Sequence, residues 1–252
     1  MKSKGQITIF IIIGLVIITI IGAVSVLRRS NIDITLPSGY ASIHSDRLRI
    51  KSLVKACGET ILKEGLFFLG RQGGYYNLPS DIFEEANYSL PYYYNDHSKV
   101  PQNSLLERQI ELYFEDHIEK CINDATKFGD RYTYELIDSD AEINENKVQL
   151  HLDMPFQIEV SNFKSEINNF TIVNNVRLGH MMNVTKKAID LVEEYPDRYD
   201  YTFILNQDVL ISIIPLPNKL DIYVITDPES EKIEFRQYAL MFAVQKWKRV
   251  FS

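Results

Sequence analysis

The feature that most constrains this chain is an uncharged apolar segment close to its N-terminus. Residues 7–27 contain no charged side chain, and most of them are Ile, Val or Leu. As a helix, this segment would be about 31 Å long, which matches the roughly 30 Å hydrocarbon core of a bilayer. A removable secretory signal has a shorter apolar region of ~7–15 residues. We therefore expect residues 7–27 to remain as a transmembrane anchor in contact with membrane lipid.

The charges beside this segment say little about its orientation. Lys2 and Lys4 precede it, and Arg28 and Arg29 follow it, so the positive-inside rule favours neither side. Residues 28–252 carry all 34 acidic residues but only 25 of the 27 basic ones, a formal net charge of −9. This balance, with no basic run apart from the chain end, excludes nucleic acid as an expected partner.

Three N-x-S/T sequons lie downstream of the anchor, at Asn87, Asn169 and Asn183. Such sequons are possible glycosylation sites in exported proteins. Together with the acidic balance and a pair of cysteines, they favour export of the downstream part. We expect a single-pass protein of the cell membrane, with a cytoplasmic N-terminus and an extracellular C-terminal domain.

The sequence after the anchor predicts an α+β fold. Residues 1–30 are interpreted as cytoplasmic tail and anchor, and residues 31–44 as a tether, because Leu36-Pro37-Ser38-Gly39 interrupts a helix. Residues 45–130 are interpreted as a helical pair joined by a Tyr-rich loop. Residues 131–252 are interpreted as a β-rich part with one further helix.

Apolar spacing predicts the individual elements. The first helix is expected from Ser45 to about Gly70, and the second from Ser104, where Ser104-Leu105-Leu106-Glu107 has the pattern of a capping box. Because helices come first and strands mostly later, the sheet should be mainly antiparallel. The expected later elements are a helix at 180–194 and strands at 132–137, 147–152, 156–160, 169–176, 201–205, 209–214, 220–226 and 233–244.

Each predicted helix of the pair presents one cysteine on its apolar face, Cys57 on the first and Cys121 on the second. Two helices packed side by side could bring these residues together. In an oxidising compartment we expect a disulfide between them. The alternative is two buried free thiols that act as small hydrophobic side chains.

Tyrosines are concentrated between the two helices. Tyrosine offers a rigid apolar face and one hydroxyl, which suits contacts with glycans or proteins. The alternative is that these rings form a small core above the helices. The candidate contact residues are Tyr75, Tyr76, Tyr92, Tyr93 and Tyr94.

No catalytic motif is present: the chain lacks nucleotide-binding, zinc-protease, serine-hydrolase and C-x-x-C patterns. Glu111, Glu115 and His117 lie near Cys121 in the sequence, but zinc needs three or four converging ligands. Another acidic group, Asp197, Asp200 and Asp208, lacks the ligand spacing of a calcium loop. We expect no metal site and no cofactor.

Residues 2–10, Lys-Ser-Lys-Gly-Gln-Ile-Thr-Ile-Phe before an apolar run, resemble the start of archaeal type IV pilin-like precursors. The resemblance implies cleavage by a prepilin peptidase between Gly5 and Gln6, followed by packing of the apolar helix into a filament. Phe10 stands where pilins usually have a glutamate.

Most of the domain is similar to a group of uncharacterised single-pass membrane proteins of small-genome archaea. The residues that carry this similarity are Cys57, Leu69-Gly70-Arg71-Gln72-Gly73-Gly74-Tyr75, Leu90-Pro91-Tyr92-Tyr93-Tyr94 and Cys121-Ile122. The resemblance implies the same compartment and organisation, without an activity.

Our leading hypothesis from the sequence is a non-enzymatic cell-surface protein that contacts other envelope proteins or surface glycans. A pilin-like filament subunit and a membrane-tethered hydrolase of the envelope are the two alternatives.

Overall fold

The computed structural model describes residues 38–85, 88–125, 132–136, 138–160, 163–232 and 236–246. The chain divides into two compact units, Met1–Ala41 and Ser42–Ser252, and the account below concerns the second. The expected anchor and the Gly5–Gln6 processing site lie outside the described residues. Among the helices that the structure describes, none combines the length and hydropathy needed to cross a membrane.

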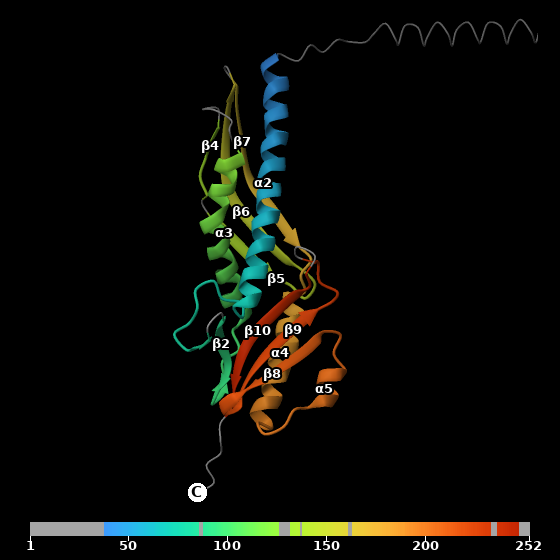
Figure 1. Cartoon of the computed structure of the whole chain (residues 1–252). Helices are drawn as coiled ribbons and strands as arrows, with labels where there is room; N and C mark the ends of the chain where they lie inside the picture. Colours follow the sequence, from blue (N-terminus) through green and yellow to red (C-terminus); the bar gives the residue numbers. More distant parts are fainter. Residues whose placement is uncertain are drawn as a thin grey trace, which may run out of the picture. The chain divides into compact units, whose positions relative to one another are not determined.

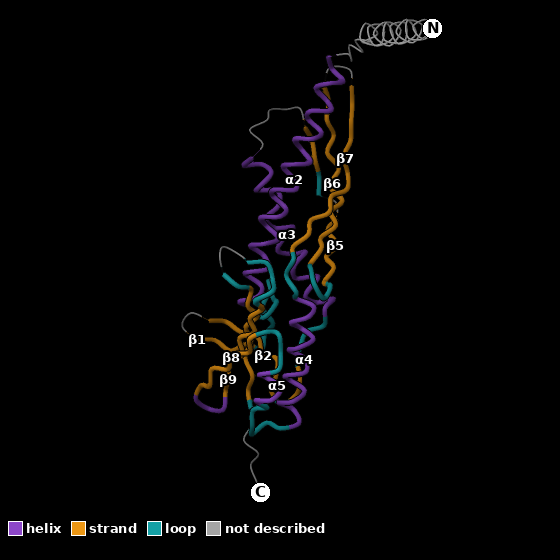
Figure 2. The backbone as a smooth tube through the Cα atoms, turned by 90° about the vertical axis from the view of Figure 1, so that its right-hand side faces the viewer, coloured by secondary structure: helices purple, strands orange, loops and turns teal. Residues whose placement is uncertain are grey.

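Two long helices, α2 (Ser38–Arg71) and α3 (Asn103–Ala125), lie side by side (Figures 1 and 2). Their predicted apolar stripes are largely buried, because residues three and four apart share one helix face. Helix α2 begins at Ser38, directly after Pro37 in the sequence, so the expected start at Ser45 was wrong and residues 38–44 are helical. Buried residues include Ile50, Val54, Cys57, Ile61 and Leu62 on α2, and Leu106, Ile110, Phe114 and Ile118 on α3.

The first sheet consists of β4 (Tyr132–Tyr134), β5 (Asp138–Ile143), β6 (Val148–Val160) and β7 (Phe163–Asn174), all antiparallel. Strand β6 pairs with β7 along one edge and with β4 and β5 along the other. The sequence predicted β4 and part of β7, divided β6 into two strands and missed β5. A tight turn joins β5 to β6, where the N–H of Asn144 donates to the carbonyl of Lys147 at 2.9 Å.

The second sheet has the order β1-β2-β10-β9-β8, with the short β3 also paired to β2. Only β2 and β10 run parallel. The bounds are β1 Ile82–Glu85, β2 Tyr88–Asn95, β3 His97–Ser98, β8 Leu210–Leu216, β9 Leu220–Asp227 and β10 Tyr238–Gln245. The expected Tyr-rich loop therefore contains three strands.

Helix α4 (Leu178–Glu194) crosses one face of the second sheet (Figure 1) and buries nine residues, among them Met181, Ile189 and Val192. The expected strand at residues 201–205 was wrong: Tyr201–Leu205 forms the short helix α5. Its N-cap decides this, because the carboxylate of Asp200 accepts from the N–H of Phe203 at 2.9 Å. A single 3₁₀ turn, η1 (Pro217–Lys219), connects β8 to β9.

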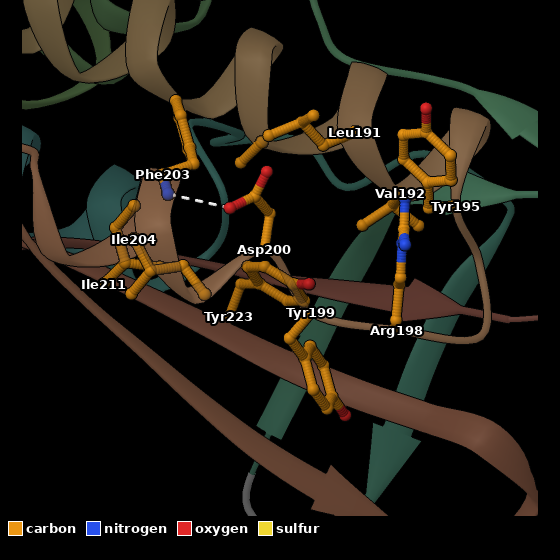
Figure 3. A pocket seen from close by; sticks show the side chains of 11 residues that line it. Leu191, Val192, Tyr195, Arg198, Tyr199, Asp200, Phe203, Ile204, Ile211 and Tyr223 are labelled. Atoms are coloured by element: carbon orange, nitrogen blue, oxygen red, sulfur yellow. Dashed lines mark hydrogen bonds between the residues drawn. The ribbon is translucent and has the colours of Figure 1, made fainter.

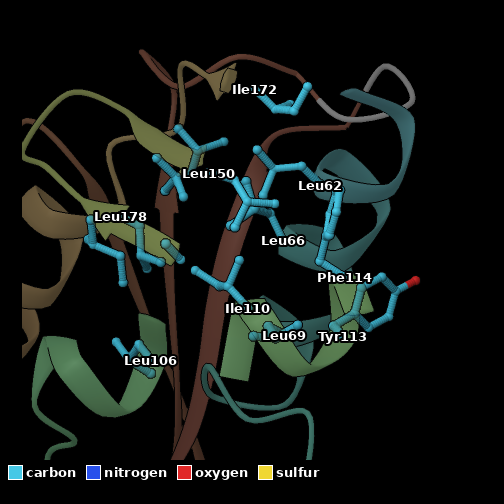
Figure 4. Packing of buried hydrophobic residues seen from close by; sticks show 14 of the residues in the cluster. Leu62, Leu66, Leu69, Leu106, Ile110, Tyr113, Phe114, Leu150, Ile172 and Leu178 are labelled. Carbon is cyan, nitrogen blue, oxygen red and sulfur yellow. The ribbon is translucent and has the colours of Figure 1, made fainter. Parts of the chain in front are cut away.

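The expected division at residue 130 is not an architectural boundary. One buried cluster contains Leu62 and Leu66 of α2, Ile110 of α3 and Leu150 and Ile172 of the first sheet (Figure 4). The parallel pairing of β2 with β10 also joins the two expected parts. The described residues thus form an α+β fold with two mainly antiparallel sheets and four α-helices.

A glycine turn ends α2 and places it against the second sheet. Gly73 and Gly74 have φ angles of +58° and +80°, a conformation that side chains disfavour. A Cβ on Gly73 would lie 2.5 Å from Cγ of Pro91, and one on Gly70 would lie 2.4 Å from the carbonyl oxygen of Ala239. Only glycine permits this close approach of α2 to β2 and β10.

Candidate ligand-binding groove

A disulfide joins α2 to α3, as the sequence predicted. Cys57 and Cys121 have Cα atoms 5.8 Å apart and an S–S distance of 2.06 Å. The bond closes a loop with a sequence separation of 64 residues. It therefore fixes α2, whose C-terminal end carries Phe67, Phe68 and Arg71 of the groove described below, to α3.

The structure separates the tyrosines that the sequence grouped together. Tyr93 is fully buried and Tyr94 nearly so, so their assignment to a contact surface was wrong. The ring of Tyr93 stacks on Phe242 at 4.3 Å between centroids, and its hydroxyl donates to the carbonyl of Gly73 at 2.8 Å. Both rings belong to the main buried cluster of the fold.

Tyr75, Tyr76 and Tyr92 remain partly exposed. The segment holding the first two is fixed by buried Gln109, whose Oε1 accepts from the N–H groups of Tyr76 and Asn77 at 2.9 and 2.8 Å. The Tyr76 hydroxyl donates to Asp116 at 2.8 Å. This hydrogen bond, and then burial, raises the pKa of Tyr76.

A groove of about 290 Å³ lies where the C-terminal end of α2 meets the start of β2. Two exposed rings line it, Phe68 with 37% and Tyr88 with 49% of its surface accessible. Its remaining lining residues are Phe67, Arg71, Gln72 and Ser89. The size is close to the lower limit for small-molecule sites, and the mixture of aromatic and polar side chains is typical of them.

The polar residues that line the groove are Arg71, Gln72 and Ser89. The Oε1 atom of Gln72 is buried and has no hydrogen-bond partner among the described residues. A buried acceptor in that state costs free energy unless something donates to it. The guanidinium carbons of Arg71 and Arg236 lie 5.8 and 5.7 Å from the ring centre of Phe67, so positive charge borders the groove.

The aromatic surface continues from the groove onto α3. Phe68 contacts Tyr113 and Tyr76, with ring centres 5.7 and 6.1 Å apart, and Tyr113 stacks on His117 at 4.2 Å. These contacts hold Phe68 in place while its outer edge remains accessible. The groove wall is therefore rigid, which lowers the entropic cost of binding.

Sequence reasoning gave none of Phe67, Phe68, Arg71 and Gln72 a binding role. Helical spacing alone could not show that Phe68 is exposed, because adjacent residues of this helix, such as Ile61 and Leu62, can both be buried.

Two other cavities among the described residues are smaller than the groove. The pocket in Figure 3, between α4, α5 and the second sheet, holds about 30 Å³, enough for roughly one water molecule. Tyr199 lines it, and burial together with the nearby Asp221 carboxylate raises the pKa of this phenol to about 12. A third cavity of about 130 Å³ lies between α2, α3 and the first sheet, beside Ile50 and Tyr134.

The acidic residues weighed as metal ligands have other partners. Glu111 accepts from the N–H of Ala141, and Glu115 accepts from the hydroxyl of Ser139. The ring of His117 contacts the carbonyl of Tyr113 at 2.6 Å, and Cys121 is in the disulfide.

The three aspartates considered for calcium also have partners. Asp197 pairs with Lys219, Asp200 caps α5, and Asp208 binds Arg177 and His180. No group of three potential metal ligands converges among the described residues.

A charged network around buried Asp227 fixes the start of α4 to the end of β9. Arg177 donates through Nε and Nη2 to both carboxylate oxygens of Asp227, at 2.9 and 2.8 Å. Asp227 also accepts from the hydroxyl of Ser230 and the N–H of Glu229. Burial alone would raise the pKa of Asp227, but these donors hold it below its ordinary value. The network is satisfied internally, so we assign it to stability.

Two of the three predicted glycosylation sequons lie among the described residues. Asn169 on β7 and Asn183 on α4 are both exposed. Asn87 lies outside the described residues.

The described residues form a disulfide-linked α+β protein with a groove lined by aromatic side chains. Comparison of the chain with protein-family models, curated proteins and solved structures gave no match.

Proposed function

We propose that this chain is a membrane-anchored protein of the cell exterior that binds a surface glycan through the groove at the end of α2. Residues 7–27 serve as the anchor, and the N-terminus is cytoplasmic. The Cys57–Cys121 disulfide supports the exterior location, because such bonds persist in oxidising compartments. The exposed sequons at Asn169 and Asn183 agree with it.

The observation that carries the proposal is the exposure of Phe68 and Tyr88 beside an unpartnered buried acceptor. Apolar C–H faces of a sugar ring pack on aromatic rings, and its hydroxyls can donate to Oε1 of Gln72 once rotation of that side chain exposes this buried atom to the groove. None of the residues that line the groove is a carboxylate. Glycoside hydrolysis generally uses a pair of carboxyl groups, so the groove favours binding over cleavage.

The test is binding of full-length protein, in detergent micelles, to arrayed oligosaccharides of neutral hexoses and of uronic acids. We expect retention on at least one class. Phe68→Ala combined with Tyr88→Ala should weaken it at least 30-fold, the loss expected for two central aromatic contacts worth about 2 kcal/mol.

Two variants serve as controls. Tyr88→Phe keeps the ring and should bind like the unmodified protein. Tyr201→Ala removes a ring that is 64% exposed on α5, outside the groove, and should also bind normally. Failure to bind either sugar class, or binding that survives loss of both groove rings, would overturn the proposal.

A further inference from the structure

One ion pair among the described residues is buried at both ends. Lys246 directly follows β10, and its Nζ lies 2.8 Å from Oδ2 of Asp221, the second residue of β9. Their side chains are 8% and 4% exposed, whereas every other ion pair of the described residues has at least one side chain that is more than a tenth exposed. Buried ion pairs seldom add net stability, because the removal of both charges from water offsets their attraction. The strength of the ion pair itself therefore does not account for its burial.

The register of β9 and β10 places both side chains on the same face of the second sheet. Asp221 pairs directly with Val244, and Lys246 follows two residues later, so Lys246 is the diagonal neighbour of Asp221. Val244 and Tyr223 on this face belong to the main buried cluster. The backbone N–H of Lys246 donates to the carbonyl of Lys219 at 2.9 Å, which continues the pairing of the two strands. The amine and the carboxylate are therefore held together by the backbone as well as by their charges.

Tyr199, from the segment between α4 and α5, completes the cluster. Its hydroxyl donates to both carboxylate oxygens of Asp221, each at 3.0 Å. Its ring lies beside the ammonium of Lys246, with Nζ 3.7 Å from the ring centre. Burial and the nearby carboxylate raise the pKa of the Tyr199 phenol to about 12, so it keeps its proton. The carboxyl group of Asp221 therefore contacts one amine and one hydroxyl donor in a site that excludes bulk water.

We propose that Lys246 and Asp221 react with each other to form an intramolecular amide, an isopeptide bond, in the mature protein. The ammonium first transfers a proton to the carboxylate, which gives a neutral amine and a carboxylic acid. The lone pair of Nζ then attacks Cγ of Asp221. A C–N bond forms and a C–O bond breaks, and the departing oxygen takes the acid proton and one amine proton as water. The reaction consumes no oxidant or cofactor and removes both buried charges.

The contacts of the cluster favour this reaction. The fixed contact between amine and carboxyl group replaces a collision in solution, which supplies a large effective concentration. The hydroxyl of Tyr199 can stabilise the negative charge that develops on the carboxyl oxygen during the attack. Arg177 and Asp227 form the matched unreactive pair, because a guanidinium remains protonated and offers no nucleophilic lone pair. The choice of lysine at position 246 therefore permits a chemistry that arginine would exclude.

The test is peptide mapping by tandem mass spectrometry of the full-length protein, purified in detergent and digested with trypsin. Trypsin does not cleave after a linked lysine, so residues 237–248 should be recovered joined to residues 220–232. The joined product should be lighter than the two separate peptides by about 18 Da, the mass of one water molecule. We expect most of the protein in this form. Recovery of free peptides 220–232 and 237–246 from the folded, unmodified protein, or a link through another residue, would overturn the proposal.

Two variants and one internal control test the roles of the residues. Lys246→Arg keeps the charge but has no nucleophilic amine, and it should yield only the separate peptides. Tyr199→Phe keeps the ring but loses the hydroxyl, so the bond should form at least about tenfold more slowly; an unchanged rate would overturn the role of Tyr199. Lys219, which pairs with Asp197 at the surface, should remain unlinked and cleavable. Thermal melting shows whether each variant is folded, and the unmodified protein alone decides whether the bond exists.

Discussion

The carboxylate of Glu111 on α3 accepts a hydrogen bond from the backbone N–H of Ala141 on β5 at 3.0 Å. Glu107 repeats the contact with Ile143, one helical turn earlier and two strand residues later. The spacing agrees, because four helical residues rise about 6 Å and two strand residues about 6.8 Å. A helix running antiparallel to the strand can therefore satisfy its N–H groups in sequence.

Replacing this acceptor should weaken the edge of the first sheet. We expect Glu111→Ala to lower the free energy of unfolding by about 1–3 kcal/mol, because it leaves the N–H of Ala141 without its partner. Amide exchange at Ala141 should accelerate in the same variant. Glu111→Gln retains an acceptor oxygen and should lie much closer to the unmodified protein, and exposed Glu119→Ala should change little. Equal effects of Ala and Gln at position 111 would contradict the assignment.

The disulfide should contribute about 4 kcal/mol to the free energy of unfolding, from closure of a loop with a sequence separation of 64 residues. We expect the reducing agent dithiothreitol to lower the urea midpoint of the unmodified protein. Cys57→Ala with Cys121→Ala should start from the lowered midpoint and not respond to the reductant. Alkylation of both cysteines in non-reduced membrane-derived protein would show that the bond is absent.

The Arg177–Asp227 pair should respond strongly to loss of one partner. Arg177→Met leaves a carboxylate whose side chain is fully buried without its main donor, which costs about 3–5 kcal/mol. Thermal or urea unfolding measures this loss. Lys63→Met, which removes an exposed ion pair with Glu231, should cost less than about 1 kcal/mol.

The same pair predicts a dependence of stability on pH. The pKa of Asp227 is lowered in the folded protein, so its stabilisation is complete above the ordinary value of 3.8 and is lost as the pH falls below it. Unfolding free energies measured from pH 5 to pH 2 should therefore fall more steeply in the unmodified protein than in Asp227→Asn. If the unfolding free energies of the two proteins changed equally with pH, the lowered pKa of Asp227 would be contradicted.

Gly73→Ala should destabilise the fold by about 1–3 kcal/mol, because it combines a φ of +58° with a Cβ 2.5 Å from the Pro91 ring. Asp96 offers the reverse experiment. It has a φ of +71° on the exposed turn between β2 and β3, so Asp96→Gly should be neutral or slightly stabilising. Thermal melting distinguishes the two, and similar losses at both positions would contradict the conformational explanation.

The proposed anchor can be tested by charge insertion. We expect the full-length protein in the membrane fraction after alkaline carbonate washing. Ile13→Arg with Ile17→Arg should release it, because each arginine at the centre of a span costs about 2.5–3.5 kcal/mol. Leu48→Arg, at an exposed site on α2, is the control and should stay in the membrane. Recovery of the unmodified protein in the soluble fraction would exclude the anchor.

How much the sequence could predict depended on how local the determining interactions were. The apolar stripes of α2 and α3 placed Cys57 and Cys121 on facing surfaces, so the disulfide was predictable. The prediction of a strand at residues 201–205 was wrong. An alternation of only five residues is weak evidence for a strand, and the N-cap hydrogen bond accepted by Asp200 stabilises a helix there instead. The predicted start of α2 at Ser45 was wrong because Gly39 disfavours a helix less strongly than a proline at the same position would.

Strand β2 could not be predicted from its own residues. Pro91 and three consecutive tyrosines obscure any alternation, and the partner that makes it a strand, β10, lies about 150 positions away in the chain. The groove was also inaccessible to sequence reasoning, because it forms only where Phe68 of α2 meets Tyr88 of β2. The Glu107 side chain, expected in a capping box, instead bonds to β5 for the same reason.

The central position of β10 has a consequence for biogenesis. This strand is the last that the structure describes, yet it lies between β2 and β9. A chain that emerges from a ribosome or translocon exposes β2 and β9 first. These two strands cannot pair through β10 until β10 has emerged. Completion of the second sheet therefore waits for β10, and a nascent chain that stalls before Tyr238 leaves β2 and β9 without the strand that joins them.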